Sequence, residues 1–385
     1  MTSGAFGRAG RALVGAILAW SLCADAAGPC ASATAFSERG AHAVGVRTYT
    51  LIDASRPTPA HGTFPGSPDR TLVLEVWYPA TTAGRDAPLD RTAGAWPLVL
   101  YSHALQDSRT GEEYLTTHLT SHGYVVAAVD FPLGKITAPG GATPSDVGSQ
   151  PGDLRFVLDW LLAQSADASS DLAGAVDAER IGAGGLSLGA TTTLLAAFHP
   201  DLRDARLRAI LPIAPPYSCA MTSRFFDTAT LPMLVLHGTV DRLVPIEPNG
   251  EAVLRRANGP RFLVRVQRGS HLGFVGFATS LAPTVRVDDV GCAGLKLSLG
   301  ANIDAIPLPG GAAEGISGQT RRCPAPCRRP APAQSIDPAS QHMIAQTVFV
   351  AFFDAYLRDD DSARCFLRKR LDREVPGVSV ERRGG

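Results

Sequence analysis

The sequence has no excess of charge of either sign, because its 36 lysine and arginine residues balance 36 aspartate and glutamate residues. Nothing in this balance predicts binding to nucleic acid or to another polyanion. The chain has no internal repeat, and beyond its extreme N-terminus it has no apolar run long enough to cross a membrane. What remains is typical of a globular enzyme: 385 residues, 45% of them hydrophobic, suffice for one large α/β domain or for two small ones.

The N-terminal residues have the pattern of a secretory signal peptide. Arg8 and Arg11 give a positive first region, residues 12–24 form a short apolar core, and the Ala-Asp-Ala sequence at 24–26 offers a cleavage site. An uncleaved anchor or a lipoprotein signal are the alternatives. Because the apolar run is short for a membrane span, we expect a signal peptide over residues 1–26, its removal after Ala26, and a secreted or periplasmic product.

Cysteine usage agrees with export. Removal of the signal peptide discards Cys23 and leaves an even number, which predicts disulfide bonds in an oxidising compartment. The Cys323-Pro-Ala-Pro-Cys327 segment also fits half of a metal site, but no matching cysteine or histidine pair lies nearby, so disulfides are favoured and no metal is expected. The sequence alone does not indicate which cysteines pair with each other. The remaining cysteines are Cys30, Cys219, Cys292, Cys323, Cys327 and Cys365.

Strand and helix signals alternate from about Pro97 onward, and this alternation predicts an α/β fold with a mostly parallel sheet flanked by helices. The segment 124–130 is a continuous apolar run, which is typical of a strand covered on both faces. The predicted strands cover residues 43–52, 71–78, 97–101, 124–130, 180–183, 209–213, 233–237 and 262–266, and the predicted helices lie within 112–121, 154–162, 190–198 and 341–358.

Two segments interrupt this pattern. Residues 281–335 are rich in glycine, proline and alanine and contain three of the cysteines, so we expect an irregular insertion held by cross-links. The C-terminal residues 372–385 are expected to form a flexible tail. The predicted organisation is therefore a single catalytic domain over residues 27–371 that contains the insertion.

The most informative stretch is Gly185-Leu186-Ser187-Leu188-Gly189, which lies between a strand-like segment and a helix-like run. A GxSxG sequence in this setting is typical of the nucleophile elbow of an α/β-hydrolase, where a sharp strand-to-helix turn strains the serine backbone and exposes its hydroxyl. Only residues without a side chain fit two positions before and two positions after the serine. The chain has 39 glycines, so a GxSxG sequence can also occur in it by chance. The assignment therefore depends on partner residues further along the chain.

Two downstream residues complete a candidate catalytic triad. A serine hydroxyl is a poor nucleophile until a base removes its proton, and the base must be oriented by an acid. In this fold the chain order is serine, then aspartate or glutamate, then histidine. Asp241 follows the predicted strand 233–237, and His271 follows the predicted strand 262–266. With Ser187, both therefore lie at the carboxyl ends of strands, the edge at which open α/β sheets bind ligands.

Other residues are weaker candidates for these roles. Asp130 also ends a strand, but it precedes the serine in the chain. His237 lies directly before Gly238 at a strand end, so we expect it to support the loop of Asp241 rather than to act as the base. His103, in the loop after the first parallel strand, is expected to buttress that loop.

The oxyanion hole needs two backbone donors. The N–H of Leu188 is at the start of the helix that follows the nucleophile, and the N–H of Leu105 is in the loop that carries the second donor in this fold. The segment after the strand that ends near Pro215 contains four apolar or aromatic residues, for which we expect one of two roles: they line an apolar acyl site, or they belong to the core. They are Tyr217, Met221, Phe225 and Phe226. No long insertion separates the elbow from Asp241, which favours an accessible site without a large lid.

Taken in order, these motifs resemble one family. The sequence Leu-Glu-Val-Trp-Tyr-Pro-Ala at 74–80, the Ser-His loop at 102–103, His-Gly-Tyr-Val-Val-Ala-Ala at 122–128 and the elbow are similar to the platelet-activating-factor acetylhydrolase-like and predicted dienelactone-hydrolase-like α/β-hydrolases. The resemblance covers most of the chain from about residue 43 to residue 275, together with the final helix. It implies the α/β-hydrolase fold and a serine-dependent hydrolase.

The chain departs from this family at two positions. Family members usually carry glycine where Ala104 stands, and histidine or a similar residue where Leu186 stands. True dienelactone hydrolases use a cysteine nucleophile, whereas this chain has Ser187, so an esterase is favoured over lactone chemistry.

The sequence thus predicts an exported serine esterase that cleaves carboxylic esters through an acyl-enzyme. Its expected partner is a small-molecule or lipid-like ester, with no nucleic acid, no stable membrane span after signal cleavage, and no metal or organic cofactor. A lipase, a polyester hydrolase or a peptidase of the same fold are alternatives, as is an exported binding domain without catalysis. The ester chain length and the oligomeric state are not fixed by the sequence.

Overall fold

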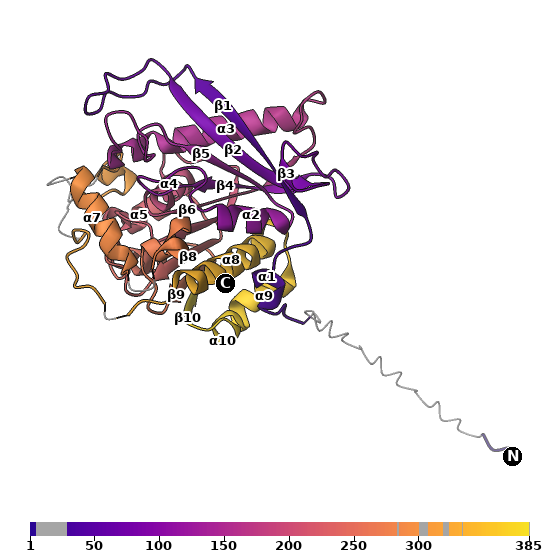
Figure 1. Cartoon of the computed structure of the whole chain (residues 1–385). Helices are drawn as coiled ribbons and strands as arrows, with labels where there is room; N and C mark the ends of the chain where they lie inside the picture. The colour runs from indigo at the N-terminus through magenta and orange to yellow at the C-terminus, as the bar shows by residue number, and fades with distance from the viewer. Residues whose placement is uncertain (5–28, 283–284, 300–306, 319–322, 333, 385) are drawn as a thin grey trace.

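The computed structural model describes residues 1–4, 29–282, 285–299, 307–318, 323–332 and 334–384. These residues form one large sheet with helices on both of its faces (Figure 1). Apart from its first four residues, the predicted signal peptide lies outside the described residues. No helix among the described residues is long and apolar enough to cross a membrane.

The strands of the sheet have the order β10-β9-β8-β7-β6-β4-β5-β2-β1-β3. The strands β4 to β9 run parallel to one another. The pairs β1–β2, β2–β5 and β9–β10 are antiparallel. The mostly parallel α/β sheet predicted from the sequence is therefore confirmed. The strands are β1 (Ala43–Asp53), β2 (Arg70–Ala80), β3 (Gly84–Arg85), β4 (Trp96–Ser102), β5 (Val125–Asp130), β6 (Val176–Leu186), β7 (Leu207–Ile213), β8 (Met233–Gly238), β9 (Arg261–Val266) and β10 (Val378–Arg383).

Apart from α1, which precedes β1, the helices connect the parallel strands or follow the last of them. In the described part of the chain they are α1 (Thr34–Ser37), α2 (Glu113–Ser121), α3 (Gln150–Ala166), α4 (Leu188–Phe198), α5 (Ser223–Phe226), α6 (Gly250–Arg256), α7 (Val287–Leu299), α8 (Pro338–Leu357), α9 (Asp361–Lys369) and α10 (Leu371–Glu374). Short 3₁₀ turns include η2 (Ser218–Ala220) and η3 (Leu272–Phe274).

The central strands are buried on both faces. In β4, Leu98 and Leu100 join an apolar cluster with α3 and α4, whereas Val99 and Tyr101 join a second cluster that contains α8. Successive side chains of a strand point to opposite faces, so this alternation builds two hydrophobic layers around one sheet. Because β4, β6, β8 and β9 run in the same direction, their carboxyl ends lie at one edge of the sheet, and this edge carries the predicted site residues.

The insertion at 281–335 was expected to be irregular, and this is wrong in one part, because it contains helix α7 (Figure 1). Gly291 and Gly294 lower the intrinsic helix propensity of this segment, so the helix was not predicted from the sequence. A Cβ at Gly291 would overlap the side chain of Leu272, so the glycine lets α7 approach the loop that carries His271. Tertiary packing thus outweighs local propensity here.

The C-terminal tail was expected to be flexible, and this is also corrected. Residues Val378–Arg383 form β10, which pairs antiparallel with β9 at the edge of the sheet. Arg265 of β9 makes an ion pair with Glu381 of β10 at 2.9 Å. In this segment Val378 and Val380 alternate with polar residues. This pattern is too short to predict a strand unless the neighbouring strand β9 is known.

The cysteines that follow the predicted signal peptide are all paired. The bonds are Cys30–Cys365, Cys219–Cys323 and Cys292–Cys327. The preference for disulfides over a metal site in the Cys323-Pro-Ala-Pro-Cys327 segment is confirmed, since its two cysteines bond to different partners. Three disulfides are typical of a protein that folds in an oxidising compartment.

Candidate active site

Ser187 occupies a strained turn between β6 and α4. Its backbone has φ 55° and ψ −122°, a conformation that side-chain-bearing residues rarely adopt. The Ser187 N–H donates to the carbonyl of Ile213 on the neighbouring strand at 2.9 Å, which fixes the turn to the sheet. The strained elbow predicted from the sequence is thus present.

The glycines on either side of Ser187 are required by space. A Cβ at Gly185 would lie 2.6 Å from the carbonyl oxygen of Ser102, and one at Gly189 would overlap the same oxygen. The elbow therefore packs directly on the end of β4, and the prediction that only residues without side chains fit here is confirmed.

Asp241 and His271 meet at the ends of β8 and β9. The Nδ1 atom of His271 lies 2.7 Å from Oδ2 of Asp241, and both side chains are buried. The other carboxylate oxygen, Oδ1, accepts a hydrogen bond from the N–H of Val244 at 2.7 Å. The carboxylate is therefore held from both sides, and it orients the imidazole with Nε2 free to face another group.

The electrostatics of this pair favour an ionised carboxylate. Although burial opposes its charge, His271 and hydrogen bonding lower the pKa of Asp241 to about 2. Burial alone would lower the pKa of His271, but the charge and hydrogen bond of Asp241, with a contribution from Asp288, raise it above its usual value. Such a pair stabilises an imidazolium, which a histidine base becomes when it takes a proton.

The competing acid and base candidates have other roles. His237 uses Nε2 to bind the carbonyl oxygen of Val244 at 2.8 Å, and the same atom lies 3.5 Å from Oδ2 of Asp241. The expectation that it supports the Asp241 loop is confirmed. Asp130 makes an ion pair with Arg109 at 2.8 Å and also accepts the Arg109 N–H, so its carboxylate is already occupied.

Ser187 and His271 line the same cavity, which has a volume of about 330 Å³. The cavity opens at the strand edge identified from the sequence. Leu105 and Leu188, the two predicted oxyanion donors, also line it. Among the described residues, neither of their N–H groups has a hydrogen-bond acceptor, so both remain available to a ligand.

His103 stabilises the loop that carries Leu105. Its Nε2 accepts a hydrogen bond from the N–H of Phe131 at 3.1 Å, so Nδ1 carries the proton and donates to the carbonyl of Ala104 at 2.7 Å. Burial lowers the pKa of His103, which keeps the ring neutral in this bridging role. The predicted buttressing function is confirmed.

The four residues suggested for an acyl site separate into two groups. Tyr217 lines the cavity, and burial raises its pKa to about 12. Met221, Phe225 and Phe226 do not line it; they are fully buried in the hydrophobic cluster beneath the sheet. For these three the core alternative is the correct one. Phe226 packs edge-to-face on Phe225 and on Phe198 of α4, and the rings of Phe198 and Phe225 lie tilted to each other at 6.2 Å.

The insertion forms a wall that the sequence did not place at the site. Val290, Gly294 and Leu295 of α7 line the cavity, as do Pro324, Ala325 and Pro326. The expectation of an accessible site without a lid considered only the segment before Asp241. The wall comes instead from residues that follow His271.

Asp288, in the first turn of α7, contacts the loops of the candidate site and was not identified from the sequence. Its buried carboxylate accepts hydrogen bonds from the N–H groups of His271 at 3.2 Å, Leu272 at 2.9 Å and Arg242 at 3.1 Å. It thus ties the loops of Asp241 and His271 to α7. The only signal in the sequence was an acidic pair within a segment without clear periodicity.

Replacing Asp288 with alanine should lower both Tm and kcat, because three buried donors lose their acceptor at about 1–3 kcal/mol each. The KM should change less than kcat, since the loss displaces His271 rather than the substrate. Asp289→Ala is the matched control, because Asp289 is more exposed and pairs with Arg242 and Arg286. Equal Tm and kcat for Asp288→Ala and wild type would contradict the positioning role.

Comparisons with known proteins give a matching family model and a similar curated protein. A family model described as "PETase: PET hydrolase-like" matches residues 75–282. Cutinase est1 of Thermobifida alba is 29% identical over 139 residues, which are 36% of this chain and 40% of that relative. The chain thus matches less than half the length of this curated relative.

A solved structure extends the likeness to nearly the whole chain. It is described as a ferulic acid esterase from Streptomyces cinnamoneus and superimposes with a TM-score of 0.58 at 23% identity. The match covers 88% of this chain and 96% of the other. At this identity the likeness concerns the fold, and it confirms the α/β-hydrolase architecture predicted from the sequence.

Proposed function

Because this chain belongs to the PET hydrolase-like family, we propose that it is a carboxylic ester hydrolase in which Ser187, His271 and Asp241 act as a catalytic triad. The 2.7 Å hydrogen bond between His271 and Asp241, at the cavity that Ser187 also lines, carries the proposal. The likeness to Cutinase est1 supports ester chemistry.

The proposed reaction transfers an acyl group to water in two steps. The Ser187 hydroxyl attacks the ester carbonyl while His271 Nε2 takes its proton, and Asp241 stabilises the imidazolium. The N–H groups of Leu105 and Leu188 hold the tetrahedral oxyanion. Collapse of this intermediate releases the alcohol, which receives the proton from His271. Water then attacks the acyl-enzyme, with His271 again as the base, and frees Ser187 and the carboxylic acid.

We propose that the protein is located outside the cytoplasm, either secreted or periplasmic. The three disulfides support it, as does the predicted signal peptide. Within the wider α/β-hydrolase superfamily, we propose kinship with the platelet-activating-factor acetylhydrolase-like and dienelactone-hydrolase-like enzymes, which the sequence motifs resemble.

The direct test of the activity is hydrolysis of p-nitrophenyl esters of increasing acyl length by the purified, disulfide-bonded protein. We expect release of p-nitrophenol that is saturable in substrate. No cleavage of any ester in the series would contradict the proposal and would favour the exported binding domain without catalysis.

The activity should fall on acidification with a midpoint above pH 6.5, about the usual pKa of histidine. His271 must be neutral to accept the proton of Ser187, and its pKa is raised in the folded protein, so the base is lost as the pH falls through that higher value. The measurement is kcat/KM between pH 5 and 9. A profile that stays flat down to pH 5 would count against His271 as the base.

A further inference from the structure

Two parts of the insertion form a wall of the cavity beside the loops that carry Asp241 and His271. One is α7, and the other is the segment Cys323–Cys327, here called the strap. Residues 324–326 of the strap line the cavity together with Gly294 of α7. A Cβ at Gly294 would lie 3.7 Å from Oε1 of Gln106, which belongs to the oxyanion loop. The helix therefore lies close to that loop at this point of the cavity wall.

The strap is attached at both ends. Cys323 is bonded to Cys219 in the η2 turn, and Cys327 is bonded to Cys292 in α7. The N–H of Cys327 also donates to the carbonyl of Arg242, next to Asp241, at 2.7 Å. The two disulfides thus fix the strap to the sheet edge and to α7, so that its middle residues form a wall of defined position.

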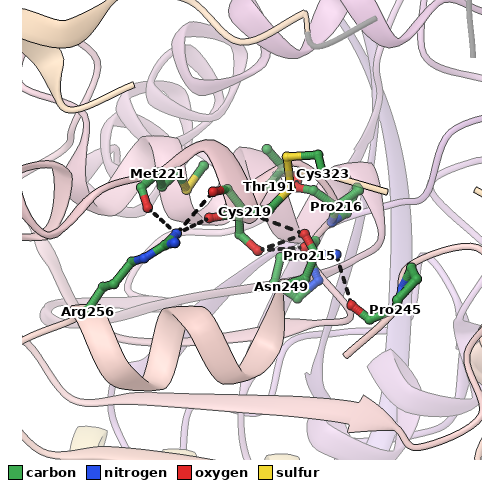
Figure 2. The surroundings of a disulfide bond; sticks show 10 residues. Thr191, Pro215, Pro216, Cys219, Met221, Pro245, Asn249, Arg256 and Cys323 are labelled. Atoms are coloured by element: carbon green, nitrogen blue, oxygen red, sulfur yellow. Dashed lines mark hydrogen bonds between the residues drawn. A yellow bond between two sulfur atoms is a disulfide. The ribbon is translucent and has the colours of Figure 1, made fainter. Parts of the chain in front are cut away.

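The anchor of the first disulfide is itself held by several hydrogen bonds (Figure 2). Asn249 accepts the N–H of Cys219 at 3.3 Å and donates to the carbonyl of Pro245 at 2.9 Å. The guanidinium of Arg256 donates to the carbonyls of Cys219 and Met221. The turn that carries the strap is therefore part of the packed protein rather than a loose loop.

The cavity is small, and the residues that line it are mostly apolar. Asp107 is the only Asp, Glu, Lys or Arg among the described residues that line the cavity. The volume of about 330 Å³ lies at the lower end of the range of roughly 300–1,000 Å³ for small-molecule sites. Three partly exposed side chains, Ile136, Phe277 and Val290, make the entrance apolar as well. A neutral ester matches this lining, whereas a carboxylate-bearing one must be desolvated near Asp107.

The wall also lies beyond the part of the chain that the family model matches. That match ends at residue 282, before the start of α7 at Val287 and before the strap. The residues that shape this side of the cavity are thus additional to the matched segment, and they can give the chain a substrate range of its own.

We propose that α7 and the strap restrict the enzyme to monomeric, neutral esters whose apolar acyl group fits inside the cavity, and that Gly294 is a specificity-determining residue. A polymer chain must extend on both sides of the ester that is cleaved, and the wall of α7 and the strap occupies part of the surface around the cavity that such a chain would need. This inference rests on the proposed ester hydrolase activity and adds its substrate class.

The test is kcat/KM for p-nitrophenyl acetate, butyrate and octanoate with wild type and Gly294→Leu. The leucine side chain would project into the space between α7 and Gln106. We expect acetate cleavage to change by less than about threefold and octanoate cleavage to fall by at least about tenfold, the scale on which a pocket discriminates a few methylene groups. An unchanged octanoate-to-acetate ratio would overturn the role of Gly294.

Two further variants separate this effect from damage to the fold. Gly294→Ala adds a methyl group at ordinary contact distance and should give an octanoate-to-acetate ratio between those of wild type and Gly294→Leu. Leu297→Ala changes a side chain of α7 that is 89% exposed and lies outside the cavity lining. If Leu297→Ala alters the profile as much as Gly294→Leu, the effect belongs to the helix as a whole, and the assignment to Gly294 is wrong.

Two further substrates test the class itself. We expect wild type to release little soluble product from an insoluble aromatic polyester film, and to cleave p-nitrophenyl butyrate at least about tenfold faster than the equally long mono-p-nitrophenyl succinate. Film hydrolysis with turnover equal to that of butyrate, or equal rates for the two soluble esters, would overturn the inference while leaving ester hydrolysis intact. Failure to cleave any of these esters would instead refute the proposed function.

Discussion

Replacing Ser187 with alanine should reduce kcat for p-nitrophenyl butyrate by about six orders of magnitude, as the loss of the nucleophile does in other serine triads. Without the hydroxyl, His271 has no proton to take and no acyl-enzyme forms, so only binding and the oxyanion donors can assist water. The substitution removes one oxygen from a turn whose backbone is held by Ile213. The fold and Tm should therefore be retained.

The matched control is Ser102→Ala. Ser102 lies at the end of β4, against the elbow glycines, and its buried hydroxyl has no hydrogen-bond partner among the described residues. We expect this variant to keep kcat within about tenfold of wild type, since the hydroxyl it loses takes no part in the reaction. Near-normal turnover by Ser187→Ala would remove the nucleophile from the account.

Asp241→Asn should reduce kcat by about four orders of magnitude, as the equivalent change does in a serine protease triad. The amide has nearly the same shape, but it carries no charge to stabilise the imidazolium and does not hold the correct tautomer of His271. The charge of Asp241 also raises the pKa of His271. The acid limb of the residual activity should therefore move to lower pH in the variant.

Asp130→Asn distinguishes Asp241 from the other aspartate that ends a strand near the site. Asp130 is paired with Arg109, so its replacement should affect stability more than turnover and should leave the pH midpoint unchanged. If Asp130→Asn were the variant with the larger loss of kcat, the acid of the triad would have been assigned to the wrong strand end.

The parts of the site that sequence reasoning reached are those with local or ordered signals. The elbow is dictated within five residues, because Gly185 and Gly189 must leave room for the carbonyl oxygen of Ser102. Asp241 follows an apolar run and His271 follows a short strand-like segment, so their position at one sheet edge is predicted by the alternation of strands and helices.

The parts that it missed depend on contacts between distant segments. Asp288 acquires its role only when α7 brings it to the N–H groups of His271 and Arg242, and Gly291 hides the helix that makes this possible. Phe225 and Phe226 follow a strand that ends at the site, but packing on Phe198 turns them into the core. No local pattern distinguishes a core aromatic residue from one that lines a pocket.

The disulfide pairing also depends on contacts between distant segments, so it could not be predicted from the sequence. Cys323 and Cys327 are four positions apart, and their partners lie at Cys219 and Cys292. Spacing identified the set of cysteines and their oxidised state but not the bonds. Only the folded chain places Cys219 and Cys292 on opposite supports of the strap, and with this arrangement the insertion becomes a wall of the cavity.

The most direct measurement of the central claim is reaction of the active protein with a fluorophosphonate, followed by mass spectrometric mapping of the adduct. An activated serine oxygen attacks the phosphorus and displaces fluoride, whereas ordinary serine hydroxyls react poorly. The account predicts one phosphonyl group on Ser187, with loss of ester cleavage in proportion to labelling. Ester cleavage by a protein that carries the adduct on another serine, or that is not labelled at all, would contradict it.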